Sequence, residues 1–220
     1  MPMPVGQTRP LLGEGDNLGL LGGAGLWQPG QALRLHLGCG EQHFPGYINI
    51  DYPPAHHQVM QVAADAYANL LQLSFPAETV DEIRLHHVFE HFNRVTALSL
   101  LIKWHEWLKP GGTLRLETPD LMGSAKHLVA PGASWKTKMG AARHLAGDQA
   151  DGWAYHLEHW FPERFEHTLA KLGFESIETS TRTWNIEPYL ANVEVTARKV
   201  PRSRNEQIAA VEELLWESKA

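Results

Sequence analysis

The chain has 220 residues, which suits one domain with short appendages, and its 43% hydrophobic and 20% charged composition is ordinary for a soluble globular protein. A formal net charge of -6 disfavours nucleic acid as the main partner, because general nucleic-acid binders are usually basic. The single cysteine, Cys39, excludes an internal disulfide and a zinc site built from several cysteines.

Neither a membrane span nor a secretory signal is predicted. The longest uncharged run, residues 17–33, contains five glycines and a proline, so it makes a poor transmembrane helix. The N-terminus lacks the basic start and the solid apolar block of a secretory signal. We therefore expect a cytoplasmic protein with no membrane partner.

Residues 1–31 are rich in glycine, proline and leucine and show no sustained helical or strand period. Two interpretations of this segment stay open. It is either a flexible arm or a strap that lays leucines and Trp27 over a ligand.

From residue 32 the apolar pattern alternates between strand and helix periods. Strands are predicted over residues 32–38, 46–51, 59–65, 80–86 and 113–119. A helix is predicted over residues 94–108, where apolar residues recur at helical spacing before the end signal KPGG. Strands that alternate with helices favour an α/β fold, with a doubly wound, mostly parallel sheet that helices cover on both faces.

The C-terminal part of the chain is less regular. We expect a helix over residues 161–174, and then two strands within residues 174–200 that pair antiparallel at a sheet edge. Residues 204–220 form a predicted amphipathic helix, which packs on its own domain or on a partner chain, so a homodimer stays open. The apolar stripe of this helix is expected to contain Ile208, Val211 and Leu215. The expected organisation is an arm over residues 1–31, one domain over residues 32–200 and a terminal helix over residues 201–220.

The stretch LRLHLGCGEQHFPGYINID places a glycine turn directly after the first strand and an aspartate at the end of the next strand. Gly38 and Gly40 let the backbone turn tightly and approach a ligand closely. Asp51 offers acceptors for two ribose hydroxyls. In an open parallel sheet, ligands bind beyond the carboxyl ends of the strands. These features suit a cofactor that contains adenosine.

The same turn lacks the features that bind a dinucleotide. Such a turn needs a third glycine and a helix behind the pyrophosphate. Here His43 stands at the third position, Pro45 opposes a regular helix, and ten residues separate Gly40 from Asp51. A full crossover needs about a dozen residues. The turn therefore favours a ligand with a ribose and no phosphate, such as S-adenosylmethionine.

Four segments carry a family resemblance: LHLGCGEQHFPGYINID, SFPAETVDEIRLHHVFEHF, LKPGGTLRLETPDL and HWFPERFEHTLAKLGFESIE. With them the chain resembles the class I S-adenosylmethionine-dependent methyltransferases. The nearest likeness is to a bacterial subgroup with a short loop after the first strand, often associated with cell-envelope polysaccharide genes. The resemblance covers roughly residues 33–178, and its motifs are specific for fold and cofactor rather than for the acceptor.

The resemblance implies roles by position. The glycine turn would line the methionine part of S-adenosylmethionine, Asp51 would bind the ribose diol, and Asp65 and Ala66 would flank the adenine. The implied cofactor-binding residues are Gly38, Cys39, Gly40, Asp51, Asp65, Ala66 and His86.

Histidine is unusually frequent, with thirteen residues, and two clusters are candidates for the acceptor side of the site. The stretch LHHVFEH contains His87 and Glu90 after a predicted strand. His159 lies near the end of the aromatic segment DGWAYHLEHWF, residues 151–161. We expect this segment to close over the acceptor and His159 to open the helix that follows. A histidine with an unperturbed pKa of ~6.5 suits proton removal at neutral pH. His87, His159 and Glu90 are therefore the predicted catalytic residues.

A zinc site is a weaker alternative, because His87 and His91 stand four residues apart; we expect no metal. The favoured function is S-adenosylmethionine-dependent methyl transfer to the oxygen or nitrogen of a small molecule or sugar. A non-catalytic module that binds an adenosine ligand and acts through a partner stays open. His36 and Gln42 keep it open, since they replace an acid and a glycine that many relatives carry.

Overall fold

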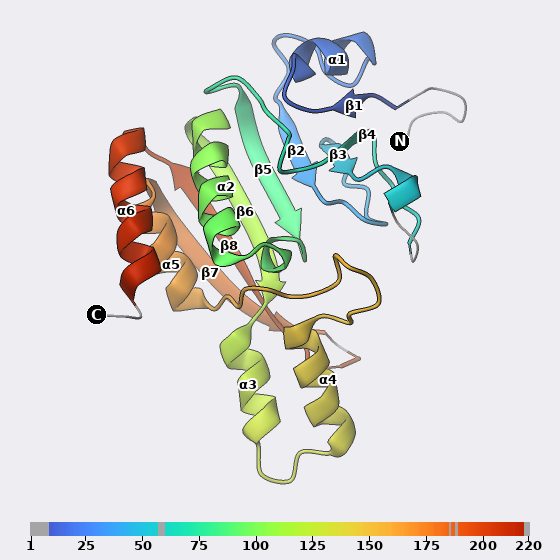
Figure 1. Ribbon diagram of the computed structural model, residues 1–220, viewed down its shortest axis with the longest axis vertical. Helices are drawn as coiled ribbons and strands as arrows, with labels where there is room; N and C mark the ends of the chain where they lie inside the picture. The colour runs from blue at the N-terminus through green and yellow to red at the C-terminus, as the bar shows by residue number, and fades with distance from the viewer. Residues whose placement is uncertain (1–8, 57–59, 185, 188, 218–220) are drawn as a thin grey trace.

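The computed structural model describes residues 9–56, 60–184, 186–187 and 189–217. A single eight-stranded sheet runs through the molecule (Figure 1) in the order β1-β4-β3-β2-β5-β6-β8-β7. The strands are β1 Leu11–Leu12, β2 Arg34–Leu37, β3 Ile48–Asp51, β4 Ala66–Ala68, β5 Val80–His86, β6 Leu108–Pro119, β7 Phe174–Thr183 and β8 Ala191–Lys199. Neighbours pair in parallel except for the two pairs that β8 makes, with β6 and β7. The predicted fold, a doubly wound and mostly parallel sheet with an antiparallel C-terminal edge, is confirmed.

Six α-helices and two short 3-10 turns accompany the sheet in the described ranges. The helices are α1 Asn17–Gly23, α2 Arg94–Trp107, α3 Leu121–Val129, α4 Trp135–Ala146, α5 Pro162–Lys171 and α6 Arg204–Trp216; the turns are η1 Pro54–His56 and η2 Phe89–His91. The helices predicted over residues 94–108 and 161–174 are present. Within the described residues, none of these helices combines the length and apolar character that a membrane crossing requires.

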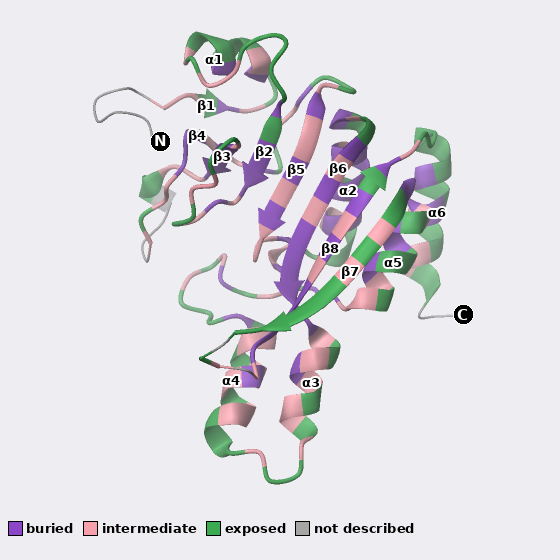
Figure 2. Cartoon of the chain, turned by 180° about the vertical axis from the view of Figure 1, so that it is seen from behind, coloured by how far each residue is buried: buried purple, intermediate pink, exposed green. Residues whose placement is uncertain are grey.

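Helices cover one face of the central strands. In Figure 1, α2, α5 and α6 lie together in front of β5, β6, β8 and β7, whereas Figure 2 shows the opposite face of these strands without a helix over it. Over these four strands, therefore, the described residues place helices on one face of the sheet, where the sequence predicted helices on both. The loop that follows β2 is too short for a crossover helix, since only residues 38–47 separate β2 from β3.

The two faces of the sheet differ in chemistry because side chains alternate along a strand. Ile83 and Leu85 on β5 are fully buried, as are Trp104 on α2 and Phe165 on α5, and each such side chain contributes about 1.5–3 kcal/mol through burial. On the uncovered face Arg115 reaches carboxylate oxygens of Glu82 at 3.6 Å and Glu194 at 3.2 Å. A polar network therefore takes the place of a helix layer on that face.

The strand predicted over residues 59–65 occurs further along the chain. Residues 60–65 form no strand, and β4 begins at Ala66. The register explains the shift, because Ala66 pairs with Ile50 and Tyr67 pairs with Asp51, which places the end of β4 beside the end of β3. Residue 59, within the predicted range, lies outside the described residues.

The N-terminal segment joins the sheet. Leu11 on β1 pairs in parallel with Tyr67 on β4, and Leu21 on α1 is fully buried in the core. Trp27 packs against the core beside Thr79 and Lys109, at the amino ends of the strands. The part of the predicted arm that lies in residues 1–8 is outside the described residues.

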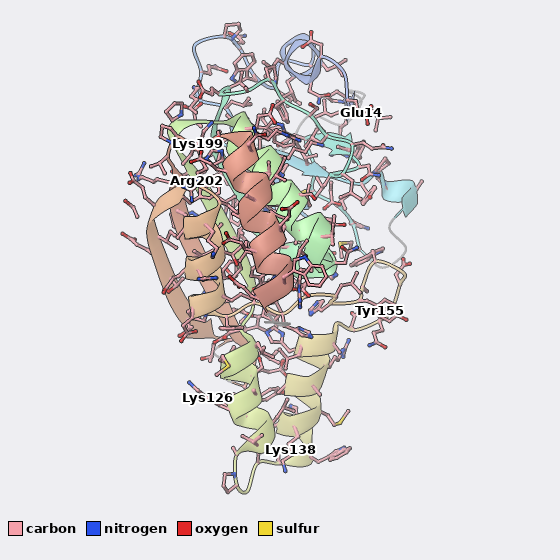
Figure 3. The ribbon with its side chains drawn as sticks, turned by 60° about the vertical axis from the view of Figure 1, so that its left-hand side comes forward. Glu14, Lys126, Lys138, Tyr155, Lys199 and Arg202 are labelled. Carbon is pink, nitrogen blue, oxygen red and sulfur yellow. The ribbon has the colours of Figure 1, made fainter. Side chains whose placement is uncertain are left out.

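The C-terminal half adds a helical hairpin and a terminal helix to the sheet. The helices α3 and α4 form a hairpin beyond the carboxyl end of β6 (Figure 1), and Lys126 points away from this hairpin in Figure 3. The sequence patterns did not predict this hairpin. The helix α6 packs along α2 and α5 (Figure 1). Its buried residues are Gln207 and Ala210, whereas Ile208 is 44% exposed, so the predicted stripe is wrong at that residue.

Candidate functional site

The glycine turn closes the end of β2 onto the end of β3. Gly38 has a φ of 70° and donates its N–H to the carbonyl of Ile50 at 2.8 Å. A Cβ at this position would lie 2.4 Å from Cγ2 of Val88. Both the backbone angle and the close approach to the chain after β5 therefore require glycine.

Asp51 is held at the same edge of the sheet by the turn. Its Oδ2 accepts the N–H of Gly40 at 2.6 Å, and its Oδ1 accepts the N–H of Tyr52 at 2.6 Å. The side chain is buried, and Gly40 has a φ of 53°. An ionised carboxylate accepts about four hydrogen bonds, so the turn fixes the orientation of Asp51 while its oxygens still suit a pair of ribose hydroxyls.

A cavity of about 640 Å³ opens beside this turn. It lies at the switch point of the sheet, because β2 pairs with β3 on one side and with β5 on the other. The predicted residues that line it are Gly38, Cys39, Gly40, Asp51, His86 and His87. The structure therefore brings the glycine turn, the ribose-binding candidate and both histidines to one place. Burial raises the pKa of the Cys39 thiol, so this residue stays neutral there.

The two residues predicted to flank the adenine do not line this cavity. Asp65 Oδ2 instead accepts the backbone N–H of Asn49 at 2.9 Å and its side-chain amide at 2.8 Å, and Asp65 Oδ1 faces His43 Nε2 at 3.0 Å. Ala66 is fully buried within β4. The residues that follow β3 and β4 line the cavity in their place: Tyr52, Met60, Asn69, Leu70 and Leu71. Asn69 directly follows β4, so a sequence prediction with β4 at residues 66–68 would have pointed to Asn69.

His86 and His87 lie next to each other but carry different charge. Burial, helped by Arg84, lowers the pKa of His86 to about 4 despite a nearby carboxylate. Burial would also lower the pKa of His87, but the carboxylates of Glu117 and Glu90 outweigh it and raise the pKa to about 10. His87 therefore stays an imidazolium at neutral pH and is a hydrogen-bond donor rather than a ready base.

Geometry explains the strong coupling of His87. Its Nδ1 lies 3.3 Å from Glu90 Oε1 and its Nε2 lies 3.6 Å from Glu117 Oε1. The residue has a φ of 52°, an angle that non-glycine residues seldom adopt and that is typical of functional sites. Burial would raise the pKa of Glu117, yet His87, His86 and Arg182 together lower it to about 2.

The aromatic segment over residues 151–161 forms part of the wall of the cavity. Trp153, Tyr155 and Leu157 line the cavity itself, and Figure 3 shows Tyr155 on this segment above the hairpin. Trp153 and His156 also line a second cavity of about 710 Å³, which extends towards α4. The segment therefore separates two adjoining spaces.

The histidine of this segment that reaches the site is His156. His159 lines neither cavity and does not open a helix, because α5 begins at Pro162. Two further side chains that the sequence patterns did not single out, His144 and Trp184, line the second cavity. His156 stands three residues before His159 in the same motif, but an irregular segment gives no period from which to choose between them.

The alternative zinc pair of His87 and His91 is not formed. Residues 89–91 are a 3-10 turn rather than a helix, so the two rings do not share a helical face. Both nitrogens of His87 face carboxylates, as described above. His91 instead turns towards His156, with ring centroids 4.9 Å apart.

Comparisons with known proteins identify the fold. No protein-family model matches the chain, and no curated protein matches its sequence. A SAM-dependent methyltransferase from Archaeoglobus fulgidus has a TM-score of 0.51 at 14% identity, covering 81% of this chain and 91% of that one. The methyltransferase complex with an activator protein from Haloferax volcanii has a TM-score of 0.51 at 12% identity, covering 84% of this chain and 90% of that one.

Human N-acetylserotonin methyltransferase in complex with SAM has a TM-score of 0.49 at 15% identity, covering 77% of this chain. The chain spans about half the length of that protein, 48%. At these identities the likeness shows the fold alone, which is the Rossmann-like fold of the class I SAM-dependent methyltransferases.

Proposed function

We propose that the protein transfers a methyl group from S-adenosylmethionine to the oxygen or nitrogen of a small molecule or sugar. The observation that carries this proposal is Asp51, held by the N–H of Gly40 at the edge of a cavity at the switch point of the sheet. The cavity fits the ligand, since about 640 Å³ lies within the usual range for such sites. When bound, S-adenosylmethionine supplies an electrophilic methyl group on its sulfonium.

The residues of the chain would contribute mainly alignment. Asp51 would accept hydrogen bonds from the two ribose hydroxyls, and the turn from Gly38 to Gly40 would present its backbone to the methionine part. Asn69 and Leu70 would border the adenine. Alignment of two reactants accounts for much of the acceleration that an in-line displacement needs. The second cavity, next to the first, would hold the acceptor.

Of the predicted catalytic residues, His87 lines the cavity proposed for the cofactor, and Glu90 lies buried beside it. Glu90 keeps His87 charged and fixed, so we assign His87 the part of an oriented donor. His156 suits a neutral role at the acceptor, because burial lowers its pKa. The assignment of His159 as a base has no support from its position outside both cavities.

The test is a screen of metabolites and nucleotide sugars with methyl-labelled S-adenosylmethionine, preceded by calorimetry with S-adenosylhomocysteine and NAD. Binding of S-adenosylhomocysteine together with label transfer to an acceptor is the expected result. Heat with NAD and none with S-adenosylhomocysteine would contradict the proposal. Binding without transfer to any acceptor would favour the non-catalytic binding module.

A further inference from the structure

Glu90, His91 and His156 bring one carboxylate and two imidazoles together at the border of the two cavities. One candidate ligand atom from each residue lies within 4.8 Å of the other two. Glu90 Oε1 is 3.9 Å from His156 Nε2. A tetrahedral ion with bonds of about 2.1 Å keeps its ligand atoms about 3.4 Å apart. Side-chain shifts of about 1 Å or less would therefore close the three atoms around one ion.

The carboxylate of Glu90 is buried and incompletely partnered. The residue is 1% exposed, and its Oε2 has no hydrogen-bond partner among the described residues. The Nδ1 of His156 is also buried without a partner in that part of the chain. A buried polar atom without a partner costs about 1–3 kcal/mol, and more when it is charged. A cation next to Glu90 would remove that cost for the Glu90 carboxylate.

The orientation of His91 suits a ligand. Its Nδ1 lies 3.0 Å from the carbonyl oxygen of Tyr155. Since a carbonyl only accepts, Nδ1 carries the proton and Nε2 presents its lone pair. Histidines that bind metals commonly donate their other ring N–H to a carbonyl or carboxylate in this way.

We propose that Glu90, His91 and His156 form a binding site for one divalent transition-metal ion, of the class of Zn²⁺ or Mn²⁺. Two imidazoles and one carboxylate suit first-row transition metals better than Mg²⁺ or Ca²⁺, which prefer oxygen ligands. His87 is not a ligand, because its nitrogens face Glu90 and Glu117. It positions the Glu90 carboxylate from behind.

The place of the site indicates its use. His91 lines both cavities, and His156 lines the second one. Three protein ligands leave coordination positions open, and these would face the second cavity. Oxygen atoms of the acceptor, such as neighbouring hydroxyls of a sugar, would occupy these positions. The ion would lower the pKa of a hydroxyl bound to it. This use of the ion rests on the proposed function, whereas the metal site itself does not.

The experiment is a titration of the full chain with Zn²⁺ and with Mn²⁺ by calorimetry after removal of metals with a chelator. One ion per chain is the expected result. Glu90→Gln and His156→Gln should each weaken binding by at least about 100-fold, since each removes a ligand. His167→Gln is the matched control, because His167 is an exposed histidine that pairs with Glu217 at 2.7 Å, away from the site; it should bind like the wild type.

Two results would overturn the metal site. One is the absence of binding by either ion up to millimolar concentration, and the other is equal binding by all the variants, which would assign the ion to surface histidines. If a variant does not fold, an X-ray absorption spectrum of the wild type with Zn²⁺ decides: two imidazoles in the ligand set support the site, and fewer contradict it. S-adenosylhomocysteine affinity, measured in parallel, separates failure of the metal site from failure of the proposed function.

Discussion

The two sides of the site are built in different ways. On the cofactor side, Gly38, Gly40 and Asp51 belong to one strand-loop-strand unit and are held by backbone hydrogen bonds within it. On the histidine side, Glu90 meets His156 from a segment 66 positions further along the chain. Local backbone chemistry therefore defines the first side, whereas long-range polar packing defines the second. Substitutions should separate them: changes on the cofactor side should affect turn conformation and ligand affinity, and changes on the histidine side should not.

The largest expected effect concerns the turn itself. Gly38→Ala should lower the free energy of unfolding by about 2–5 kcal/mol, because it combines a left-handed backbone angle with overpacking against Val88. Gly46→Ala is the matched control, with a φ of 82° and no atom within 4 Å of the new Cβ, and should lose only about 1–2 kcal/mol. Urea denaturation of both variants checks this. Equal losses would show that contact with Val88 contributes nothing.

A second prediction uses a histidine on the cofactor side. His36 is fully buried, and burial, with Arg84 and His86 nearby, lowers its pKa to about 4 although Asn49 accepts a hydrogen bond from it. The unfolded chain, with a histidine pKa of about 6.5, takes up this proton first. The contribution of His36 to the free energy of unfolding should therefore be fully present above pH 6.5. It should fall by up to about 3 kcal/mol as the pH decreases to 4, with no further loss from this group below that.

The measurement is denaturant unfolding of the wild type and of His36→Asn between pH 7 and pH 4. The variant should show a shallower loss, because one buried histidine no longer resists protonation, while His86 keeps its contribution in both proteins. Identical slopes would mean that the native state does not lower the pKa of His36. Such a result would also weaken the contrast with His87, which two carboxylates keep charged.

These regions also differ in how far they could be predicted. The strand over residues 80–86 and the helix from residue 94 were placed to within a residue, since apolar residues alternate along the strand and the helix lies between its cap, Asn93, and the end signal KPGG. The turn and Asp51 were identified because the ten residues between Gly40 and Asp51 are too few for a crossover helix, and this number can be read from the sequence. The start of β4 depends instead on strand pairing. Ala66 begins β4 because it pairs with Ile50 on β3, and no local sequence pattern shows this pairing.

The acceptor side depended on information that the sequence does not contain locally. His156 and His159 are equally suited by type, and only the path of an irregular segment selects one of them. The hairpin of α3 and α4 was missed because both helices are short and each contains a glycine, at positions 123 and 140, which lowers helix propensity.

A third prediction concerns Asp65, which the family resemblance assigned to the adenine. Asp65→Ala should lower the free energy of unfolding by about 1–3 kcal/mol, because it leaves the buried backbone N–H of Asn49 without its acceptor. The affinity for S-adenosylhomocysteine should stay within about 2-fold of the wild type at full folding, since Asp65 does not line the cavity. Chemical denaturation and calorimetry on one preparation test both statements. A large loss of affinity in a fully folded variant would return Asp65 to the adenine site.

The most direct test of the division between the two sides is calorimetry of S-adenosylhomocysteine with the wild type, Asp51→Asn and His156→Gln. Asp51→Asn should weaken binding about 10–100-fold, because a neutral amide replaces the charged acceptor of the ribose hydroxyls, a loss of about 1.4–2.7 kcal/mol. His156→Gln should bind within about 2-fold of the wild type, because His156 lines only the second cavity. Equal weakening in both variants, or none in Asp51→Asn, would contradict the assignment of the cofactor to the turn and Asp51.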